Sequence, residues 1–465
     1  MSKLEKINPT VKASTLYMIG NFFNKAVAFM MVPIFTRLLT TYEYGVVSTY
    51  ASWVSMFTVI VSVGLSATIR MAYFDYKDNI DRYMSSITFL VFIFSIISFF
   101  VSVIYLICGK NQLVGILVVF CVLESYAVFV QNLEINKLMM DFAYVKRTLL
   151  MSFPNFISLI FAWIVLLFTS IDRSIARVLP EVVVQAILAI YLIYKIYKKD
   201  KTTIDFGIWK YGLSLSLPLV FHSLSTMILA NFDRTMISTL RNAQETGIYS
   251  TAYNFGMIVT AISSALDGVW FPWFAKKMKM NNENLVNKVE RKYMIAIAII
   301  VCCIMLIAPD IMRLMTPSNY WGGASLIPPI VFASFIMYLI SFLVNAEYYY
   351  KKTKHIGANT FVAAIVNVVL NYILIPRYGA LAAAWTTVGA YLVSMTMHLA
   401  NVKRINKELF PLKDFILSIL FVGICCYITN MLDKFLTIRY AFVFVFIVVF
   451  VIKYFPYFKT ITKKR

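Results

Sequence analysis

The chain has 465 residues, of which 60% are hydrophobic and 14% are charged, and its formal net charge is +21. Such a chain has too few polar residues to cover the surface of a soluble globule of this size. The composition therefore excludes a soluble globular protein and predicts a polytopic membrane protein. A basic chain could also bind nucleic acid, but here the cations lie in short segments between apolar runs, without a basic domain or a base-stacking module. We therefore expect no nucleic acid among its partners.

Apolar runs of about 18 to 25 residues recur along the chain, and each could cross roughly 30 Å of hydrocarbon as a helix. The runs lack the two-residue alternation of membrane-barrel strands. Their approximate centres are Lys25, Phe57, Phe94, Leu123, Ile160, Ile187, His222, Ile258, Ile300, Ile336, Ala364, Gly389, Ile424 and Phe446. We predict an all-α polytopic membrane protein with about 14 transmembrane helices.

One stretch of the sequence is repeated in the second half of the chain. Aligning residues 43–64 with residues 245–266 leaves seven of 22 positions identical, where about one or two arise by chance. The identical pairs are Glu43/Glu245, Gly45/Gly247, Ser48/Ser250, Thr49/Thr251, Thr58/Thr260, Ile60/Ile262 and Ser62/Ser264. Internal repeats of this kind are typical of secondary transporters, which carry substrate between two similar halves.

The repeat and the span count predict three parts. Residues 1-200 form an N-terminal six-helix bundle, residues 201-405 form a C-terminal six-helix bundle, and residues 406-465 add two helices and a basic tail. Because six is even, both bundles enter the membrane from the same side, which predicts a parallel repeat with a pseudo-twofold axis along the membrane normal. With both termini cytoplasmic, 32 of the 43 Lys and Arg lie inside and ten outside, as the positive-inside rule requires.

Motifs for catalysis, nucleotides and metals are missing from the sequence. Gly109 and Lys110 are followed by Asn111, so the pair is not a phosphate-binding loop. The six cysteines lack metal-ligand spacing and fall in or at the edge of spans. We therefore assign no catalytic residue, no metal site and no cofactor.

One face of the first span carries polar residues near its centre. Asn21, Asn24 and Lys25 follow one another at i, i+3 and i+4, so they share a helical face. A charge at that depth costs about 3 kcal/mol on insertion scales, and no packing role requires an ammonium. We expect this face to line a wet cavity or to meet a partner.

Spans two and eight carry polar faces at positions that the repeat relates. Thr58 and Ser62 lie on one face, and Thr260 and Ser264 lie on the other. Such hydroxyls either line a passage or bond back to their own helix in helix contacts, and both alternatives stay open here. Asp267 follows Thr260 at i+7 and is a candidate for ion coupling.

Glu124 lies near the middle of the fourth span. It either neutralises Lys25 in a buried pair or acts as a protonatable coupling group. Glu181 in the sixth span is a further acidic candidate, whereas His398 lies near the predicted inner edge and is given no role.

Two arginines lie near the predicted outer ends of their spans. Arg37 follows Pro33 in the first span, and Arg234 lies at the end of the seventh. They are either interfacial anchors or ligands for an anion at the outer mouth. Three further polar residues lie within spans: His222, Asn367 and Asn371.

Three ordered stretches of the chain carry a family resemblance. The first runs from Pro33 to Leu39 and continues with Glu43-Tyr-Gly45. The second joins Asn231-Phe-Asp233-Arg234 to Gly247-Ile-Tyr249-Ser250, and the third runs from Leu370 to Ala384. In this order and at these separations they resemble the polysaccharide-export flippases of the multidrug/oligosaccharidyl-lipid/polysaccharide superfamily. The resemblance covers nearly the whole chain through about residue 405.

The resemblance implies a flippase for oligosaccharide units linked to a polyprenyl diphosphate, of the O-antigen, capsule or exopolysaccharide kind. It would move them from the inner to the outer leaflet of the bacterial cytoplasmic membrane by alternating access. Lys25, Arg37 and Arg234 would contact the diphosphate. The polar lining of the cavity would comprise Asn21, Asn24, Thr58, Ser62, His222, Thr260, Ser264, Asn367 and Asn371. Membrane lipids, a polysaccharide polymerase and its chain-length machinery are the expected partners.

Two other functions compete with this interpretation. A multidrug cation antiporter of the same superfamily would need acidic residues to dominate the first-half cavity, whereas the first span offers Lys25. A membrane polysaccharide polymerase would need a large outer loop or a His/Asp pair at the interface. Neither is visible, so we expect a transporter and not an enzyme.

Overall fold

The computed structural model describes residues 9–433 and 435–462, and the side chains of residues 20, 24–433 and 435–453. These residues form 14 α-helices and three short 3-10 helices, without a strand in the described ranges. Twelve helical segments among the described residues are long and apolar enough to cross a membrane. The prediction of an all-helical, multi-pass membrane protein is therefore confirmed.

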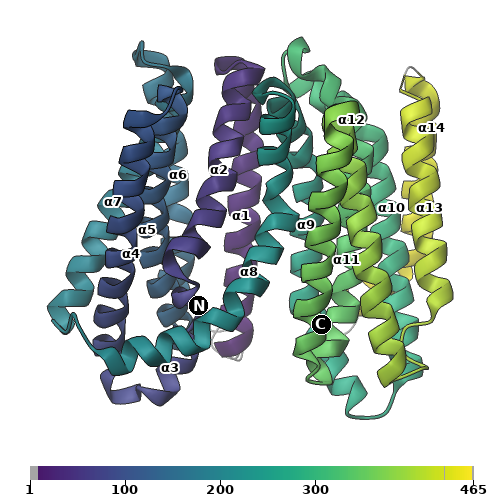
Figure 1. Cartoon of the computed structure of the whole chain (residues 1–465). Helices are drawn as coiled ribbons and strands as arrows, with labels where there is room; N and C mark the ends of the chain where they lie inside the picture. The colour runs from purple at the N-terminus through teal and green to yellow at the C-terminus, as the bar shows by residue number, and fades with distance from the viewer. Residues whose placement is uncertain (1–8, 434, 463–465) are drawn as a thin grey trace. The chain divides into compact units, whose positions relative to one another are not determined.

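The helices follow one another with short connections, as Figure 1 shows. Their bounds are α1 (Pro9–Leu38), α2 (Thr41–Ser62), α3 (Ile69–Asp75), α4 (Ile80–Cys108), α5 (Gln112–Met140), α6 (Tyr144–Phe168), α7 (Arg173–Lys199), α8 (Phe206–Leu240), α9 (Ala243–Met278), α10 (Glu283–Met315), α11 (Ile327–Tyr349), α12 (Thr353–Ile405), α13 (Leu412–Met431) and α14 (Leu436–Thr462).

The 53 residues of α12 are a helical hairpin and not one long rod. The backbone reverses at Gly379, where φ is 62° and ψ is −148°. Contacts across the reversal join residues far apart in sequence: Asn359 meets the ring of His398 at 3.2 Å, and the hydroxyl of Thr386 donates to Asn371. The hairpin therefore holds both the eleventh and the twelfth predicted spans, centred on Ala364 and Gly389.

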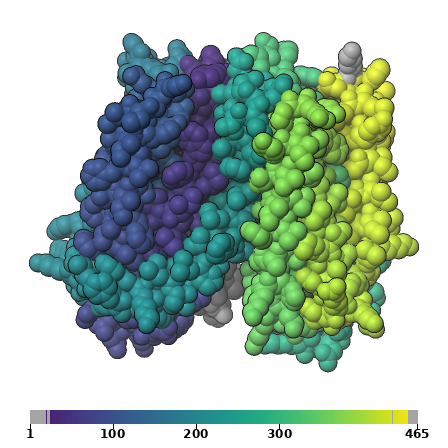
Figure 2. Space-filling view, viewed as in Figure 1, coloured from purple at the N-terminus to yellow at the C-terminus, as the bar shows by residue number. Residues whose placement is uncertain are grey.

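The chain divides into two compact units, Met1–Thr246 (unit 1) and Gly247–Arg465 (unit 2). In unit 1, α2, α4, α5, α7 and the first part of α8 share one apolar core. Figures 1 and 2 show α8 beginning across the start of α4 and then continuing beside α2. The boundary between the two predicted six-helix bundles lies at residue 200, because the sequence repeat defines it. The assignment of the chain to these bundles stays a prediction.

The two copies of the repeat begin their helices with the same hydrogen bonds. The side chain of Thr40 caps α2 by accepting from the backbone N–H of Glu43. Asn242 does the same for Glu245 at the start of α9, at 2.8 Å. A cap followed three residues later by Glu satisfies amides that the first helical turn leaves without partners.

The match continues along both helices. Thr49 donates to the carbonyl of Gly45 at 2.9 Å, and Thr251 donates to that of Gly247 at 2.8 Å. Such matched local bonds are what a duplicated sequence produces when each copy folds as its own helix.

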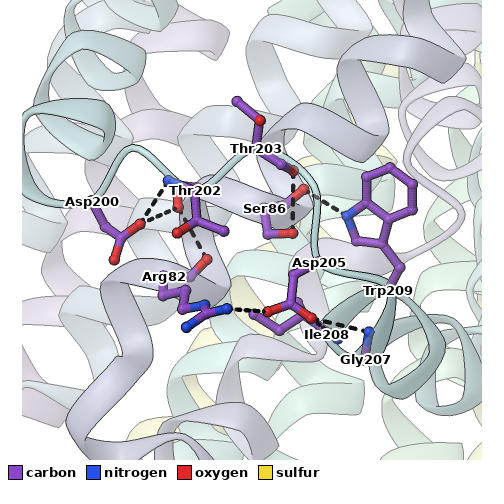
Figure 3. Close-up of polar contacts among 10 residues, drawn as sticks. Arg82, Ser86, Asp200, Thr202, Thr203, Asp205, Gly207, Ile208 and Trp209 are labelled. Atoms are coloured by element: carbon purple, nitrogen blue, oxygen red, sulfur yellow. Dashed lines mark hydrogen bonds and ion pairs between the residues drawn. The ribbon is translucent and has the colours of Figure 1, made fainter.

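The linker between α7 and α8 is fastened to the start of α4 (Figure 3). Arg82 forms an ion pair with Asp205 at 2.9 Å. The hydroxyl of Ser86 donates to the carbonyl of Thr203 at 3.3 Å, and the backbone carbonyl of Ser86 accepts from the indole of Trp209 at 3.1 Å. Asp205 also caps α8, because its side chain accepts from the first-turn amide of Ile208.

These bonds shift the ionisation of the linker carboxyls. The amide of Ile208 and the guanidinium of Arg82 lower the pKa of Asp205, and hydrogen bonds from Thr202 lower the pKa of Asp200. A carboxylate whose folded pKa is depressed stabilises the fold above its unfolded pKa of about 3.9. That contribution is lost as pH falls through the lowered folded value.

We expect Asp205→Ala to loosen the start of α8, because an N-cap is worth about 1 kcal/mol, or roughly a five-fold change in local opening. Hydrogen exchange of the peptide spanning residues 204–210 should accelerate by that factor. Asp205→Asn should accelerate it less, because Asn still caps, and the difference from the wild type should shrink as pH falls below about 4. Asp172→Ala, which removes the cap of α7, is the control and should leave this peptide unchanged.

In unit 2, α13 and α14 pack against α10. Arg439 on α14 is almost fully buried and binds Asp310 at 2.8 Å, and Arg313 holds Asp433 at 2.8 Å. Figure 2 shows both helices on the surface of this unit, where most of their apolar side chains are exposed. The ion pairs fasten these helices to α10 while the remaining apolar surface faces the lipid.

Candidate functional site

Unit 1 contains a polar cavity of about 200 Å³ between α1, α6 and α7. Asn24 on α1, Asn155 and Ser158 on α6, and Arg177 and Glu181 on α7 line it. Polar groups concentrated within an apolar helical unit mark a candidate binding site.

Close helix packing builds the walls of this cavity. A Cβ added at Gly20 would lie 2.6 Å from Thr148, so the glycine lets α1 approach α6 closely. One turn later, Asn24 donates to the carbonyl of Met151 on α6 at 3.4 Å. Ala162 and Ala176 are small and buried, and they bring α6 and α7 together beside Phe35.

Arg177 is the cation of the cavity. Its side chain is only 13% exposed, its guanidinium lies 3.2 Å from Glu181, and it stacks 4.6 Å from the ring centroid of Phe35. Stacking and pairing fix the planar group, while a guanidinium has five N–H donors and can bind a further acceptor.

A second acidic group lies behind this pair. Glu124 on α5 is buried and accepts a hydrogen bond from the hydroxyl of Tyr50 on α2 at 2.5 Å. It interacts electrostatically with both Glu181 and Arg177. Tyr50 and this electrostatic pair surround Glu124, and the predicted alternatives of a pair with Lys25 or a protonatable coupling group stay predictions.

The three predicted diphosphate ligands all lie in unit 1. Lys25 is half-buried on α1. Arg37 donates to the carbonyl of Pro33 at 2.8 Å, and Arg234 donates to Asn231 at 3.0 Å, so both have contacts on their own helices. Asn21 lies in α1, but its side chain is outside those that the structure describes.

The predicted hydroxyls bond within their own helices. Thr58 donates to the carbonyl of Val54 and Ser62 to that of Thr58, at 2.7 and 2.6 Å. Thr260 and Ser264 donate in the same way on α9. This geometry follows the back-bonding alternative, in which the donor is already used and only the lone pairs remain for a ligand.

The polar residues of α12 close the helical hairpin. Asn367 and Asn371 are fully buried, with Asn367 donating to Thr387 at 3.4 Å and Asn371 donating to Asn367 at 3.2 Å. They join the two arms of α12, as polar side chains commonly do between membrane helices.

Two other predicted residues have different surroundings. His222 on α8 is half-buried, and its Nδ1 has no hydrogen-bond partner in the described part of the chain. Asp267 on α9 accepts from Ser341 at 3.0 Å and from Asn345 at 3.4 Å, both on α11. Asp267 therefore belongs to a polar contact within unit 2.

Sequence reasoning missed the roles of Arg177 and His398. Arg177 is not among the predicted site residues, although its i, i+4 spacing from Glu181 places the two on one helical face. His398 is buried and its Nδ1 lies 2.7 Å from Glu347 on α11. No local signal reveals this second contact, because it joins residues on different helices.

Solved structures of known transporters share this fold. The chain is similar to the lipid II flippase MurJ in an inward closed conformation, with a TM-score of 0.69 and 15% identity, covering 93% of this chain and 100% of that one. It is also similar to an inward-facing multidrug resistance MATE family transporter of the MOP superfamily, with a TM-score of 0.60 and 13% identity, covering 85% and 96%. The fold is that of the MOP transporters.

Sequence comparison identifies the family within this class. Residues 10–278 match the family described as "Polysaccharide biosynthesis protein", and the chain belongs to that family. A relative is the Lsg locus putative protein 1 of Haemophilus influenzae, which is 21% identical over 378 residues, 77% of this chain and 89% of the relative. The resemblance stated from the sequence motifs is thus confirmed at the level of the family.

Proposed function

We propose that this protein is a flippase for oligosaccharide units linked to a polyprenyl diphosphate, specifically undecaprenyl diphosphate. It moves them from the inner to the outer leaflet of the bacterial cytoplasmic membrane by alternating access, with both of its own termini in the cytoplasm. The observation that carries the proposal is the polar cavity with Arg177, Asn24 and Asn155 in a membrane protein of a polysaccharide-biosynthesis family. O-antigen, capsule and exopolysaccharide precursors are the substrates of this class.

The physical need for such a cavity is large. Carrying a diphosphate and several sugars through hydrocarbon unaided costs tens of kcal/mol by Born-type estimates. Fixed cations and amides inside the protein replace the water that the head group gives up, so they remove most of that barrier. The lipid II flippase MurJ has the same fold, which supports this function for a related lipid-linked cargo.

Within this proposal, Lys25, Arg37 and Arg234 contact the diphosphate, and the asparagines and hydroxyls of the spans meet sugars. Arg177 joins the three cations, because it projects into the cavity that Asn24 lines. The polyprenyl tail stays in the lipid, and no cofactor takes part. A polysaccharide polymerase with its chain-length machinery then receives the product.

A multidrug cation antiporter is the second candidate, favoured by one observation. Glu181 lines the cavity of unit 1 and Glu124 interacts with it electrostatically, and binding of a cationic drug requires such carboxyls. Arg177 offsets one of these charges at 3.2 Å, which favours an anionic cargo instead. Drug tolerance of a host lacking the protein separates the two, since only an antiporter changes it.

We expect Lys25→Ala to abolish surface polysaccharide while lipid-linked units accumulate on the cytoplasmic side. The reason is that the half-buried ammonium of α1 is needed to bind the diphosphate within the membrane. The measurement is the leaflet distribution of labelled lipid-linked units, together with surface polysaccharide. Lys25→Arg, which keeps the charge, is the control. Single units displayed outside would indicate a polymerase defect and contradict the proposal.

Glu124 and Asp267 remain the candidates for ion coupling within this proposal. Their surroundings differ, because Glu124 has the hydroxyl of Tyr50 and Asp267 has Ser341 and Asn345. If Glu124 carries the coupling proton, Glu124→Gln should remove the pH dependence of flipping in vesicles. Retained pH dependence would exclude that role.

A further inference from the structure

Two carboxylic acids of unit 2 are buried where α10, α12 and α13 meet. Glu290 on α10 is fully buried, and in the described part of the chain neither of its oxygens has a hydrogen-bond partner. Asp414, in the first turn of α13, is 7% exposed, and its Oδ2 also has no such partner. The two carboxyls interact electrostatically.

The surrounding chain holds both groups in place. Asn287, one turn before Glu290, donates to the carbonyl of Glu408 and accepts from the amide of Phe410, each at 2.8 Å. Phe410 has a φ of 56° and a fully buried ring, which packs against Phe274 and Phe415. The connection between α12 and α13 is thus fastened to α10, one turn before Glu290.

The charges that face Glu290 come from all three helices. Asp414 approaches from α13, Arg291 from α10 and Lys403 from the end of α12. Arg291 is bound to Asp414 through its Nε at 2.9 Å. Lys403 donates to the carbonyl of Lys407 at 2.8 Å. Both cations therefore have other partners, and Glu290 receives no direct hydrogen bond from either.

A buried carboxylate without a hydrogen-bond donor is costly, and a second carboxyl close by raises the cost of ionising Glu290 further. The number of oxygen ligands at the site decides whether a metal ion or a proton neutralises the carboxyls. Metal cations of the sodium, magnesium and calcium kind take about six oxygen ligands, whereas this site offers two carboxyls flanked by two fixed cations. A proton needs only one carboxyl.

We propose that Glu290, beside Asp414, is a proton-binding site: it takes one proton from water, while Asp414 stays paired with Arg291. The proton removes one negative charge from the junction of α10 and α13, so the first turn of α13 packs firmly when the site is loaded. Release of the proton to water leaves two buried carboxylates, whose repulsion loosens that turn. The site thereby gives α13 and α14 a role in sensing pH, which goes beyond the flippase function.

Infrared difference spectra of the purified full-length protein between about pH 5 and pH 8 test this directly, because a protonated carboxylic acid has its own carbonyl band. We expect a carbonyl band of a buried acid in the wild type that is lost in Glu290→Gln and shifted in Asp414→Asn. Glu408→Gln removes a nearby exposed carboxyl and is the matched control, which should leave the band unchanged.

Two results would overturn the proposal. One is a set of spectra that are identical in the wild type, Glu290→Gln and Asp414→Asn. The other is binding of radioactive sodium that the wild type shows and Glu290→Gln lacks, since a metal ion would then occupy the site. If Glu290→Gln yields no folded protein, Asp414→Asn decides alone, because a band shifted by the loss of the neighbouring charge supports a protonated Glu290 and an unshifted band contradicts it.

Discussion

Arg177→Ala should lower the rate of flipping at least about ten-fold, the factor that corresponds to about 1.4 kcal/mol of lost interaction with a charged group. The substitution removes the cation from the cavity of unit 1 and leaves Glu181 without its partner at 3.2 Å. The measurement is flipping of a lipid-linked oligosaccharide in vesicles, normalised to the amount of folded protein. Arg177→Lys should recover part of the rate, because an ammonium restores the charge but not the planar fork.

Two comparisons separate binding from packing. Lys198→Ala removes an exposed cation near the other end of α7 and should leave the rate within about two-fold of the wild type. The double variant Arg177→Ala/Glu181→Ala removes the carboxylate that the single variant leaves unpaired. If the double variant transports like the wild type, Arg177 only balances Glu181, and the assignment of Arg177 to the substrate is wrong.

Gly379→Ala should remove most of the folded protein. The glycine has a φ of 62° and a ψ of −148°, a backbone region that is essentially restricted to glycine and costs other residues about 1–3 kcal/mol or more. The strain would fall at the reversal that lets the two arms of α12 meet, so the contacts of Asn371 and Asn367 would be lost with it. Size-exclusion profiles of detergent-extracted protein provide the measurement.

Gly389→Ala is the matched control for this variant. It lies in the second arm of α12, where an added Cβ would meet only Leu370, at 3.8 Å. That distance is an ordinary van der Waals contact, and alanine favours a helix, so we expect a normal or slightly raised yield. Equal yields of the two variants would contradict the view that Gly379 shapes the hairpin.

The membrane spans and the repeat could be predicted from sequence because both depend on local properties. Hydropathy over about 20 residues identifies a span regardless of its neighbours. Thr40 and Asn242 cap helices by accepting from the amides of Glu43 and Glu245, three residues later, so these bonds are local and occur in both copies of the repeat. The family resemblance rests on the same ordered stretches.

The candidate site could be predicted only in part. Asn24 was found because a polar face in an apolar helix is visible in the spacing of its residues. Arg177 was missed because its place in the cavity depends on the approach of α1 and α6 to α7. The spacing of residues along one helix does not indicate which other helices contact it. The roles of the Thr58 and Ser62 hydroxyls were ambiguous, because the same spacing along a helix is compatible with lining a passage and with a hydrogen bond to the preceding turn.

The closed polar contacts of the α12 hairpin have a consequence for how the protein enters the membrane. Asn367 and Asn371 find their partners on the opposite arm, so an arm inserted alone would expose two amides to acyl chains. Partitioning from the translocon should therefore favour both arms together, with Gly379 folding them against each other before they reach lipid. Biogenesis of this segment then proceeds by co-insertion of a preassembled pair of helices, and truncation between the arms should retain the nascent chain at the translocon.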